Sequence, residues 1–238
     1  MKTVQGLAAL VSISLVGGSL VWSDPSPAPA GGGTVKGKIT FKGDAPKLAA
    51  KKVEKDAEAC GHTEVPDESL QVGEGGGLKN AVVLIRGVAG DFKPDDAKVT
   101  AFDQKGCLFD PHVLVVQKGA KVSLKNSDKV AHNVNLQATK NAAFNEIIGS
   151  DKDKVVTFGE TEKMSLSCNI HNWMNGWIVV HDSPFFAVTD DKGEFSIAGV
   201  PAGEYEVQLW HEKAKGEKQK VKVADGADAA LNAEMTAK

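Results

Sequence analysis

The most informative stretch of the 238-residue chain is residues 168–174, which read Cys168-Asn169-Ile170-His171-Asn172-Trp173-Met174. A thiol, an imidazole and a thioether lie within these seven residues, where the predicted strand Lys163–Cys168 ends. A further histidine, His132, lies near the start of another predicted strand, Val130–Leu136. Sulfur and imidazole donors from two strand ends can therefore meet at one point.

Two imidazoles and a thiolate in one plane, with a weakly bound methionine, form the ligand set of a blue-copper electron-transfer site. A lone His, Cys or Met in a strand-rich chain is more often a core or surface residue. The order Cys-x2-His-x2-Met at a strand end, with a His-Asn pair upstream, favours a metal site instead. We expect one copper ion per chain, bound by four residues: His132, Cys168, His171 and Met174.

Short runs with the periodicity of strands cover the rest of the chain, and Gly, Asp and Pro interrupt them about every 8–12 residues, as in β-sandwiches. We expect strands at 35–41, 81–85, 98–102, 112–117, 121–125, 130–136, 154–158, 163–168, 177–180, 186–189, 194–197, 205–210 and 218–223. Two segments read as short helices, Lys47–Ala59 and Ala138–Ile148. The sequence therefore predicts an all-β protein.

Composition excludes several classes of function. The formal net charge is -3, so the chain has no basic excess for binding nucleic acid. The glycine-rich loop Gln71–Lys79 lacks the Lys-Ser/Thr pair of a phosphate-binding loop. No serine nucleophile elbow and no His-Glu-x-x-His motif is present. We therefore expect no enzyme activity.

The first 30 residues resemble a signal for export. Lys2 precedes the apolar run Gly6–Trp22, and Ala28-Pro29-Ala30 offers small residues for a signal peptidase. The alternative is an uncleaved anchor, because the run is close to the shortest length that spans a bilayer. We expect a periplasmic or extracellular protein with no membrane span after removal of the signal, and a mature chain that starts between Asp24 and Gly31.

The chain has three cysteines, and in an oxidising compartment two of them are expected to pair. Cys60 and Cys107 each lie beside a glycine, whereas Cys168 lies close to His171 and Met174. The sequence therefore predicts a disulfide between Cys60 and Cys107 and leaves Cys168 free.

Residues 98–182 resemble the cupredoxins, the family of plastocyanin and amicyanin. His132-Asn133-Val134 is similar to the family's first ligand and the asparagine after it, and Cys168, His171 and Met174 match the other ligands. The resemblance implies a Greek-key β-sandwich with one copper ion, which exchanges single electrons with a redox partner protein. It also implies that Asn133 holds the ligand loop by hydrogen bonds.

The flanking residues, 31–97 and 183–238, resemble a carboxypeptidase-regulatory-like module, which has a transthyretin-like (prealbumin-like) sandwich. The resemblance lies in Thr189–Ile197 and Val200–Tyr205, whose glycines suit turns between hairpin strands. It implies a discontinuous sandwich with the copper domain inserted between its strands. The combination is similar to exported methylamine-utilisation-like proteins.

The ligand loop also predicts a docking surface for a redox partner. No charged residue lies between Lys163 and His181, so we expect an exposed ring edge at His171, with Trp173 and Trp177 beside it. The alternative is that both tryptophans are buried, and for Trp177 the two readings are equally favoured. His62 and His181 read as surface residues, and His112 as a rim residue or an alternative ligand.

Three classes of function remain open. The first is a blue-copper electron carrier, and the second is a copper-storage or copper-delivery protein that uses the same ligands. The third is an exported adhesion or carbohydrate-binding sandwich in which the Cys-His-Met cluster is accidental. The colour of a copper-thiolate site separates the first class from the other two.

Overall fold

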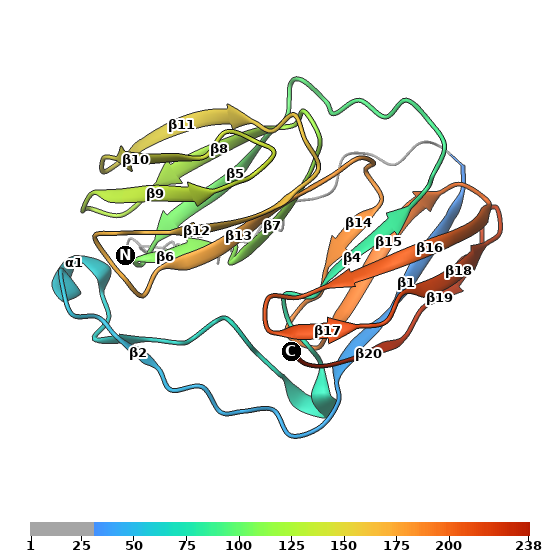
Figure 1. The fold of residues 1–238 in the computed structure, drawn as a ribbon, viewed down its shortest axis with the longest axis horizontal. Helices are drawn as coiled ribbons and strands as arrows, with labels where there is room; N and C mark the ends of the chain where they lie inside the picture. The colour runs from blue at the N-terminus through green and yellow to red at the C-terminus, as the bar shows by residue number, and fades with distance from the viewer. Residues whose placement is uncertain (1–30) are drawn as a thin grey trace, which may run out of the picture.

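The computed structural model describes residues 31–238, which form two β-sandwiches lying side by side (Figure 1). The predicted all-β fold class is confirmed, because the described residues hold only one short α-helix and one turn of 3-10 helix among many strands. The expected signal segment, residues 1–30, lies outside the described residues.

The central sandwich consists of a five-stranded and a four-stranded sheet. The first sheet has the order β10 (Phe144–Ile148), β9 (His132–Gln137), β12 (Lys163–Ser167), β13 (Asn175–His181) and β7 (Val113–Gln117). The second has the order β11 (Lys152–Thr157), β8 (Lys121–Asn126), β5 (Val99–Lys105) and β6 (Leu108–Asp110). Side chains alternate between buried and accessible along β8 and β12, as expected for strands that cover a core on one face.

The flanking sandwich combines strands from both ends of the described chain. One sheet contains β1 (Gly33–Phe41), β15 (Glu194–Val200), β17 (Ala214–Gly216), β19 (Asp228–Ala230) and β20 (Ala233–Ala237). The other has the order β14 (Phe186–Val188), β4 (Val82–Arg86), β16 (Gly203–Trp210) and β18 (Gln219–Val223). The central sandwich is therefore inserted in sequence between β4 and β14.

A third hydrophobic cluster joins the two sandwiches. Val82 and Leu84 of β4 pack there with Val113 and Val115 of β7 and with Val179 of β13. The alternate residues of β4, such as Val83, point into the core of the flanking sandwich instead. A strand buried on both faces has no need for alternating polar residues, which explains the uninterrupted apolar run that begins at Ala81.

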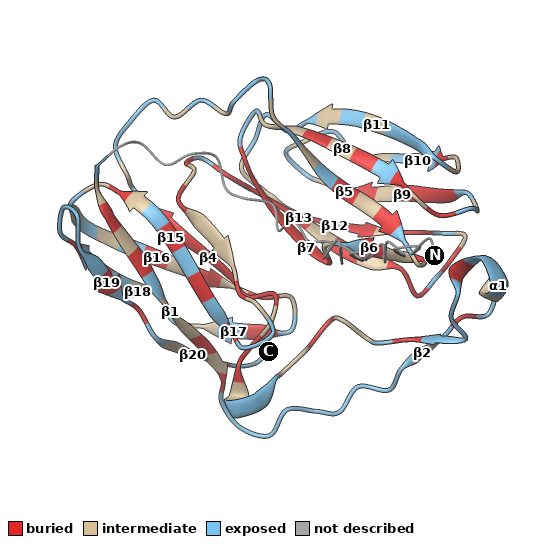
Figure 2. Ribbon diagram, turned by 180° about the vertical axis from the view of Figure 1, so that it is seen from behind, coloured by how far each residue is buried: buried red, intermediate tan, exposed pale blue. Residues whose placement is uncertain are grey.

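Residues 42–69, here called the strap, leave the flanking sandwich after β1 and cross to the end of the central sandwich (Figure 1). The strap contains β2 (Lys51–Lys52), α1 (Ala57–Cys60) and β3 (Glu64–Val65), and β2 pairs with β3. Most of it is exposed (Figure 2). Val53, Cys60 and Val65 are buried in the core of the central sandwich, so this segment of one sandwich completes the other.

The predicted disulfide between Cys60 and Cys107 is confirmed, and Cys168 is the free cysteine of the described residues. The bond joins the end of α1 to the turn between β5 and β6. It therefore ties the strap covalently to the central sandwich.

Both helix predictions need correction. Residues 144–148 form strand β10, in which Phe144 pairs with Leu136 and Ile148 with His132. The period-two order of Phe144, Glu146 and Ile148 carried this signal, because these residues are less exposed than Asn145 and Ile147 between them. Within Lys47–Ala59 only the last residues are helical, since α1 begins after Asp56, whose left-handed φ of 54° breaks any longer helix. A separate 3-10 turn, η1, covers Glu74–Gly76.

A buried polar group lies where the two sandwiches meet. His112 Nε2 contacts Glu212 Oε1 at 2.5 Å, and His112 Nδ1 lies 3.8 Å from Glu68 Oε2. His211 is 1% exposed and its Nδ1 accepts a hydrogen bond from the backbone of Lys213. These imidazoles are therefore parts of the contact between the sandwiches rather than of a surface.

No helix among residues 31–238 is long and apolar enough to cross a bilayer.

We predict that His211 makes the fold sensitive to acid. Burial lowers the pKa of His211 to about 4, against the opposing effect of the Glu212 carboxylate. Below pH 6.5 the unfolded chain therefore binds more protons at this residue than the folded chain does. The contribution of neutral His211 to the free energy of unfolding is fully present above pH 6.5 and is lost as the pH falls towards 4. Between pH 7 and 4.5, wild type should lose about 2–3 kcal/mol more free energy of unfolding than His211→Gln. Chemical denaturation at both pH values measures this difference. His62→Gln, which replaces an exposed imidazole, should match wild type, and equal acid losses in wild type and His211→Gln would contradict the prediction.

We predict one reactive thiol in the unfolded, unreduced apo-protein and three after reduction. The disulfide closes a loop of 47 positions, which corresponds to about 4 kcal/mol of stabilisation in the loop-entropy model. Thiol titration in denaturant, with and without reductant, gives the counts. Three thiols before reduction would mean that Cys60 and Cys107 are not bonded in the protein.

Candidate metal centre

The pairing of two neighbouring strands brings the predicted ligands together. His132 is the first residue of β9, Cys168 follows the last residue of β12, and these strands are paired with Ser167 opposite Asn135. The ligand loop, residues 168–174, joins β12 to β13. Its ends are tied, because Cys168 N donates to Met174 O at 3.2 Å and Met174 N donates to His171 O at 3.0 Å.

Three of the four predicted ligands form a tight, buried cluster. His132 Nδ1 lies 2.8 Å from His171 Nδ1, and Cys168 Sγ lies 3.8 Å from His171 Nδ1. Single donor atoms of these three residues all lie within 4.8 Å of one another. Met174, the fourth predicted ligand, is in the same loop and is fully buried.

Asn133 fixes the start of the ligand loop. Its side-chain Oδ1 accepts hydrogen bonds from Asn169 N at 2.7 Å and from Ile170 N at 3.2 Å. Cys168 Sγ lies 3.4 Å from the same oxygen, and His171 N donates to Cys168 Sγ at 3.4 Å. These contacts therefore fix the position of the Cys168 thiol in the metal-free protein.

The surroundings of Cys168 favour its thiolate. Burial opposes ionisation, but hydrogen bonds with His132, Asn133 and the backbone of His171 and Ile170 outweigh it and lower the pKa of the Cys168 thiol. The thiolate is the form that binds metals.

Each imidazole of the cluster has a carboxylate at its outer nitrogen. Asp128 Oδ2 lies 2.8 Å from His132 Nε2, and Asp56 Oδ2 lies 2.9 Å from His171 Nε2. Burial would lower the pKa of His132, but hydrogen bonds with Asp128 and Cys168 raise it. For His171, burial outweighs Asp56 and lowers the pKa. With a proton on each Nε2, both Nδ1 atoms can bind a metal ion.

Asp128 is itself firmly held. Its carboxylate accepts hydrogen bonds from Gly106 N at 2.6 Å and Cys107 N at 2.8 Å. Burial opposes its ionisation, but the bonds with His132 and these two backbone groups lower the pKa of Asp128. Asp128 is therefore ionised, and its carboxylate orients the His132 ring.

The donor set fits copper. A thiolate, two imidazoles and a nearby thioether are soft and intermediate donors, which suit Cu(I) and Cu(II) better than Mg²⁺ or Ca²⁺. Two other groups of titratable residues in the described part of the chain include Cys60 or Cys107. These cysteines are joined in the disulfide and offer no thiolate, so the fit is confined to the cluster around Cys168.

The predicted docking surface at Trp173 is wrong. Trp173 is 5% exposed, and its Nε1 donates to Cys107 O at 3.0 Å. His171 is completely buried rather than open at its ring edge. Trp177 is half-buried against Trp210, with ring centroids 5.0 Å apart. The strap covers the end of the central sandwich that was expected from the sequence to be exposed.

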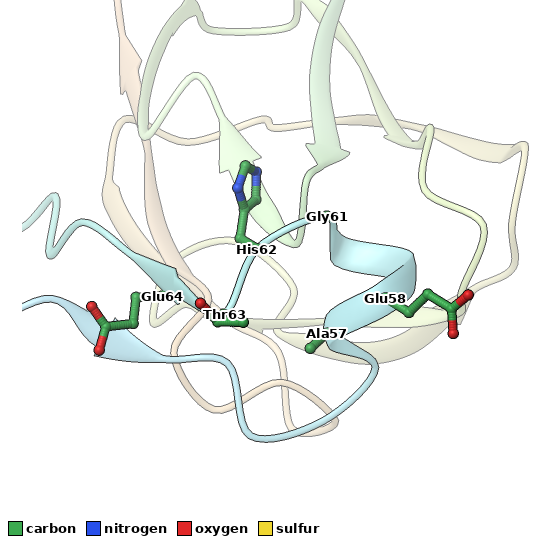
Figure 3. A pocket seen from close by; sticks show the side chains of 6 residues that line it. All are labelled: Ala57, Glu58, Gly61, His62, Thr63 and Glu64. Atoms are coloured by element: carbon green, nitrogen blue, oxygen red, sulfur yellow. The ribbon is translucent and has the colours of Figure 1, made fainter.

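The remaining histidines lie outside the cluster. His181 is fully buried, contrary to expectation, and its Nε2 lies 3.0 Å from Ile85 O. His112 is neither a rim residue nor near Cys168, because it contacts Glu212 between the sandwiches. His62 is exposed as expected, and it lines an open pocket on the strap in which Glu58 and Glu64 point in different directions (Figure 3).

The two carboxylates were not predicted from the sequence. Asp128 lies four positions before His132, a spacing that could have indicated a partner. Asp56 is separated from His171 by 115 positions, and no local pattern connects them.

We predict that Asn133→Ala loosens the ligand loop. The change removes the acceptor Asn133 Oδ1, to which the backbone N–H groups of Asn169 and Ile170 donate. This loss should lower the free energy of unfolding of the apo-protein by about 2–3 kcal/mol. The control is Asn145→Ala, which removes only the bond between Asn133 Nδ2 and Asn145 Oδ1. Denaturant unfolding of both variants gives the comparison, and a loss in Asn133→Ala no larger than in the control would show that the loop bonds are unimportant.

Comparison with known proteins identifies two regions. Residues 96–181 match the family model of copper binding proteins, plastocyanin/azurin family. Residues 159–231 match the model of polysaccharide lyase family 4, domain II. The second match begins in the central sandwich and continues into the flanking one, and it names a different module from the transthyretin-like one, which stays a prediction. A search of curated proteins found no match.

Several solved structures are similar in part. A Cu-containing nitrite reductase from Thermus scotoductus SA-01 is 23% identical, with a TM-score of 0.35, over 40% of this chain and 25% of that one. The chain thus spans about a quarter of that enzyme. A reduced Cu(I) form of an amicyanin mutant is 22% identical, with a TM-score of 0.33, over 42% of this chain and 98% of that one. A purple cupredoxin from Nitrosopumilus maritimus is 23% identical, with a TM-score of 0.28, over 31% and 82%. The region 96–181, about a third of this chain, is thus similar in sequence to the plastocyanin/azurin copper-binding family.

Proposed function

We propose that this protein is an exported blue-copper protein that binds one copper ion and carries single electrons between redox partners. The observation that carries the proposal is the buried cluster of His132, Cys168 and His171 in a region that matches a copper-binding family. The proposed role is transfer of electrons only, without chemical conversion of a substrate.

His132, Cys168, His171 and Met174 would hold the ion, and bound copper supplies a centre that gains and loses one electron. The chain supplies rigidity. Asn133 holds the loop at Asn169 and Ile170. Carboxylates hold both imidazoles, and the buried cluster excludes water from the donor atoms. Ligands that keep their places when the charge changes lower the cost of reorganisation on electron transfer.

A copper-delivery role is the main alternative. Delivery requires that a ligand reach the receiving protein, but His132 and His171 are fully buried and Cys168 is 2% exposed. This burial favours an ion that stays in place while electrons pass. We therefore prefer electron transfer with a redox partner protein.

Export is supported by the covalent chemistry of the chain. The disulfide between Cys60 and Cys107 is typical of proteins outside the cytoplasm. Together with the signal-like residues 1–30, it favours a periplasmic or extracellular location. The flanking sandwich, which we propose to be carboxypeptidase-regulatory-like, would then support the copper domain.

We predict that the purified protein takes up one copper ion per chain and develops an intense visible band, because charge transfer from a thiolate to Cu(II) absorbs strongly. Cys168→Ser should abolish the band while the far-ultraviolet circular dichroism of the sheets is unchanged. Metal analysis and visible spectroscopy after addition of Cu(II) measure both quantities.

His112→Gln is the matched control, because it replaces a buried imidazole outside the cluster. It should keep the band. A colourless wild type that binds copper would favour delivery or storage. A band that persists in Cys168→Ser would remove Cys168 from the site.

A further inference from the structure

The ring of His171 is enclosed by groups from the strap, from the turn between β5 and β6 and from its own loop. Asp56 of the strap contacts its Nε2, and the Trp173 ring packs 5.1 Å from it. Single donor atoms of Cys60, Cys107 and His171 lie within 4.8 Å of one another, so the disulfide lies directly beside the imidazole. Three different groups thus surround the edge that a ligand loop at the end of a sandwich would otherwise expose.

Asp56 lies at the outermost layer of this enclosure. Its side chain is 34% exposed while that of His171 is 0% exposed, so the carboxylate separates the imidazole from solvent. Asp56 adopts φ 54° and ψ 28° directly before α1. This left-handed conformation is uncommon for residues other than glycine, although aspartate tolerates it better than most. The backbone turn directs the side chain at His171.

The strap is held in place on both sides of Asp56. Val53 and Cys60 are buried in the core of the central sandwich, three residues before and four residues after it. The disulfide fixes Cys60 to Cys107, whose carbonyl oxygen accepts the hydrogen bond from Trp173. Asp56 is therefore placed by the strap and not by the cupredoxin domain.

We propose that Asp56 is a positioning residue for the copper ligand His171, and that the disulfide-tethered strap closes the His171 edge of the copper centre. The proposal rests on the proposed function for the identity of the metal. Asp56 keeps the His171 proton on Nε2 and the ring turned so that Nδ1 faces His132 and Cys168. The strap keeps solvent and partner proteins from direct contact with the ring.

The position of the charge has a consequence for copper. A carboxylate bound to the far nitrogen makes an imidazole a stronger donor and adds negative charge near the ion. Both effects favour Cu(II) over Cu(I), so Asp56 should hold the reduction potential down. The same contact should raise copper affinity, since loss of such a partner typically costs about 10–100-fold.

The first test uses the apo-protein, in which Cys168 is the free thiol of the described residues. Alkylation of the folded, unreduced protein at pH 7 then reports how often the site opens. Asp56→Asn should be labelled about tenfold faster or more, because a neutral amide replaces the charged acceptor of His171 Nε2 and weakens this contact of the strap. The double variant Cys60→Ser/Cys107→Ser should be faster still and still has Cys168 as its reactive thiol.

The matched control is Glu58→Gln, which removes a carboxylate two residues away on the same strap. Glu58 is exposed, and in Figure 3 its side chain points away from His62. It should be labelled at the wild-type rate. Equal alkylation rates in wild type and Asp56→Asn would overturn the proposal that Asp56 helps to close the site.

The second test reads the ring itself. In the ¹⁵N spectrum of the apo-protein at pH 7, His171 should be protonated on Nε2 in wild type and in Asp56→Glu. In Asp56→Asn the population of the other tautomer should rise. A role of Asp56 in strap folding alone would leave the tautomer unchanged in all three proteins, and that result would overturn the positioning role.

The third test uses the copper protein and separates the inference from the proposed function. Asp56→Asn should raise the reduction potential and weaken copper binding about tenfold or more, whereas Glu58→Gln should change neither. If wild type gains colour with copper but Asp56→Asn matches it in potential and affinity, the inference fails and the proposed function stands. If wild type binds no copper, the proposed function fails. The role of Asp56 as a positioning residue for a copper ligand then fails as well.

Discussion

The pairing of β9 with β12 is the contact on which the candidate metal centre depends. Its register, continued past Ser167 opposite Asn135, brings Cys168 level with Val134, two residues from His132, although the two ligands lie in separate segments of the chain. Backbone hydrogen bonds fix this register, and a slip by one residue would turn His132 to the other face of its sheet. The ligand loop then needs only a short path from β12 to β13 to bring His171 and Met174 to the same point. The centre is therefore built from sheet geometry first and from loop conformation second.

The strap changes how much of the candidate metal centre is open to solvent. In a sandwich whose ligand loop lies at one open end, a ligand histidine could contact a partner directly. Here residues 42–69 cover that end, and buried residues of the strap belong to the same core as the strands of the central sandwich. Because of this cover, the His171 ring is not exposed at the surface. The strap also places the Asp56 carboxylate on His171 Nε2. A closed, dry site has less freedom to rearrange when its charge changes, which is consistent with the electron transfer that we propose.

The two sandwiches also depend on each other through their shared apolar layer. Val82 and Leu84 pack on Val113, Val115 and Val179, so that β4 is buried on both faces. Beside this layer, His112 bonds to Glu212 and brings a residue of each sandwich into one buried contact. The strap adds a covalent tie, because its disulfide joins α1 to the turn between β5 and β6. The flanking sandwich is thus part of the environment of the central sandwich, and the relative positions of both are fixed by burial rather than by linker length.

Local pattern determined much of this protein. Strand periodicity predicted the all-β class, the Cys168–Met174 spacing gave a ligand set, and the neighbours of Cys60 and Cys107 indicated their bond. These features follow from side chains close together in sequence. The helix expected at Ala138–Ile148 failed because pairing with β9 outweighed local preference, and short strands such as β17 and β20 exist only through their partners. Only the tertiary structure placed Asp56 on His171 and buried Trp173 against Cys107. These contacts join residues 115 and 66 positions apart, which burial and the disulfide bring together and no local pattern connects.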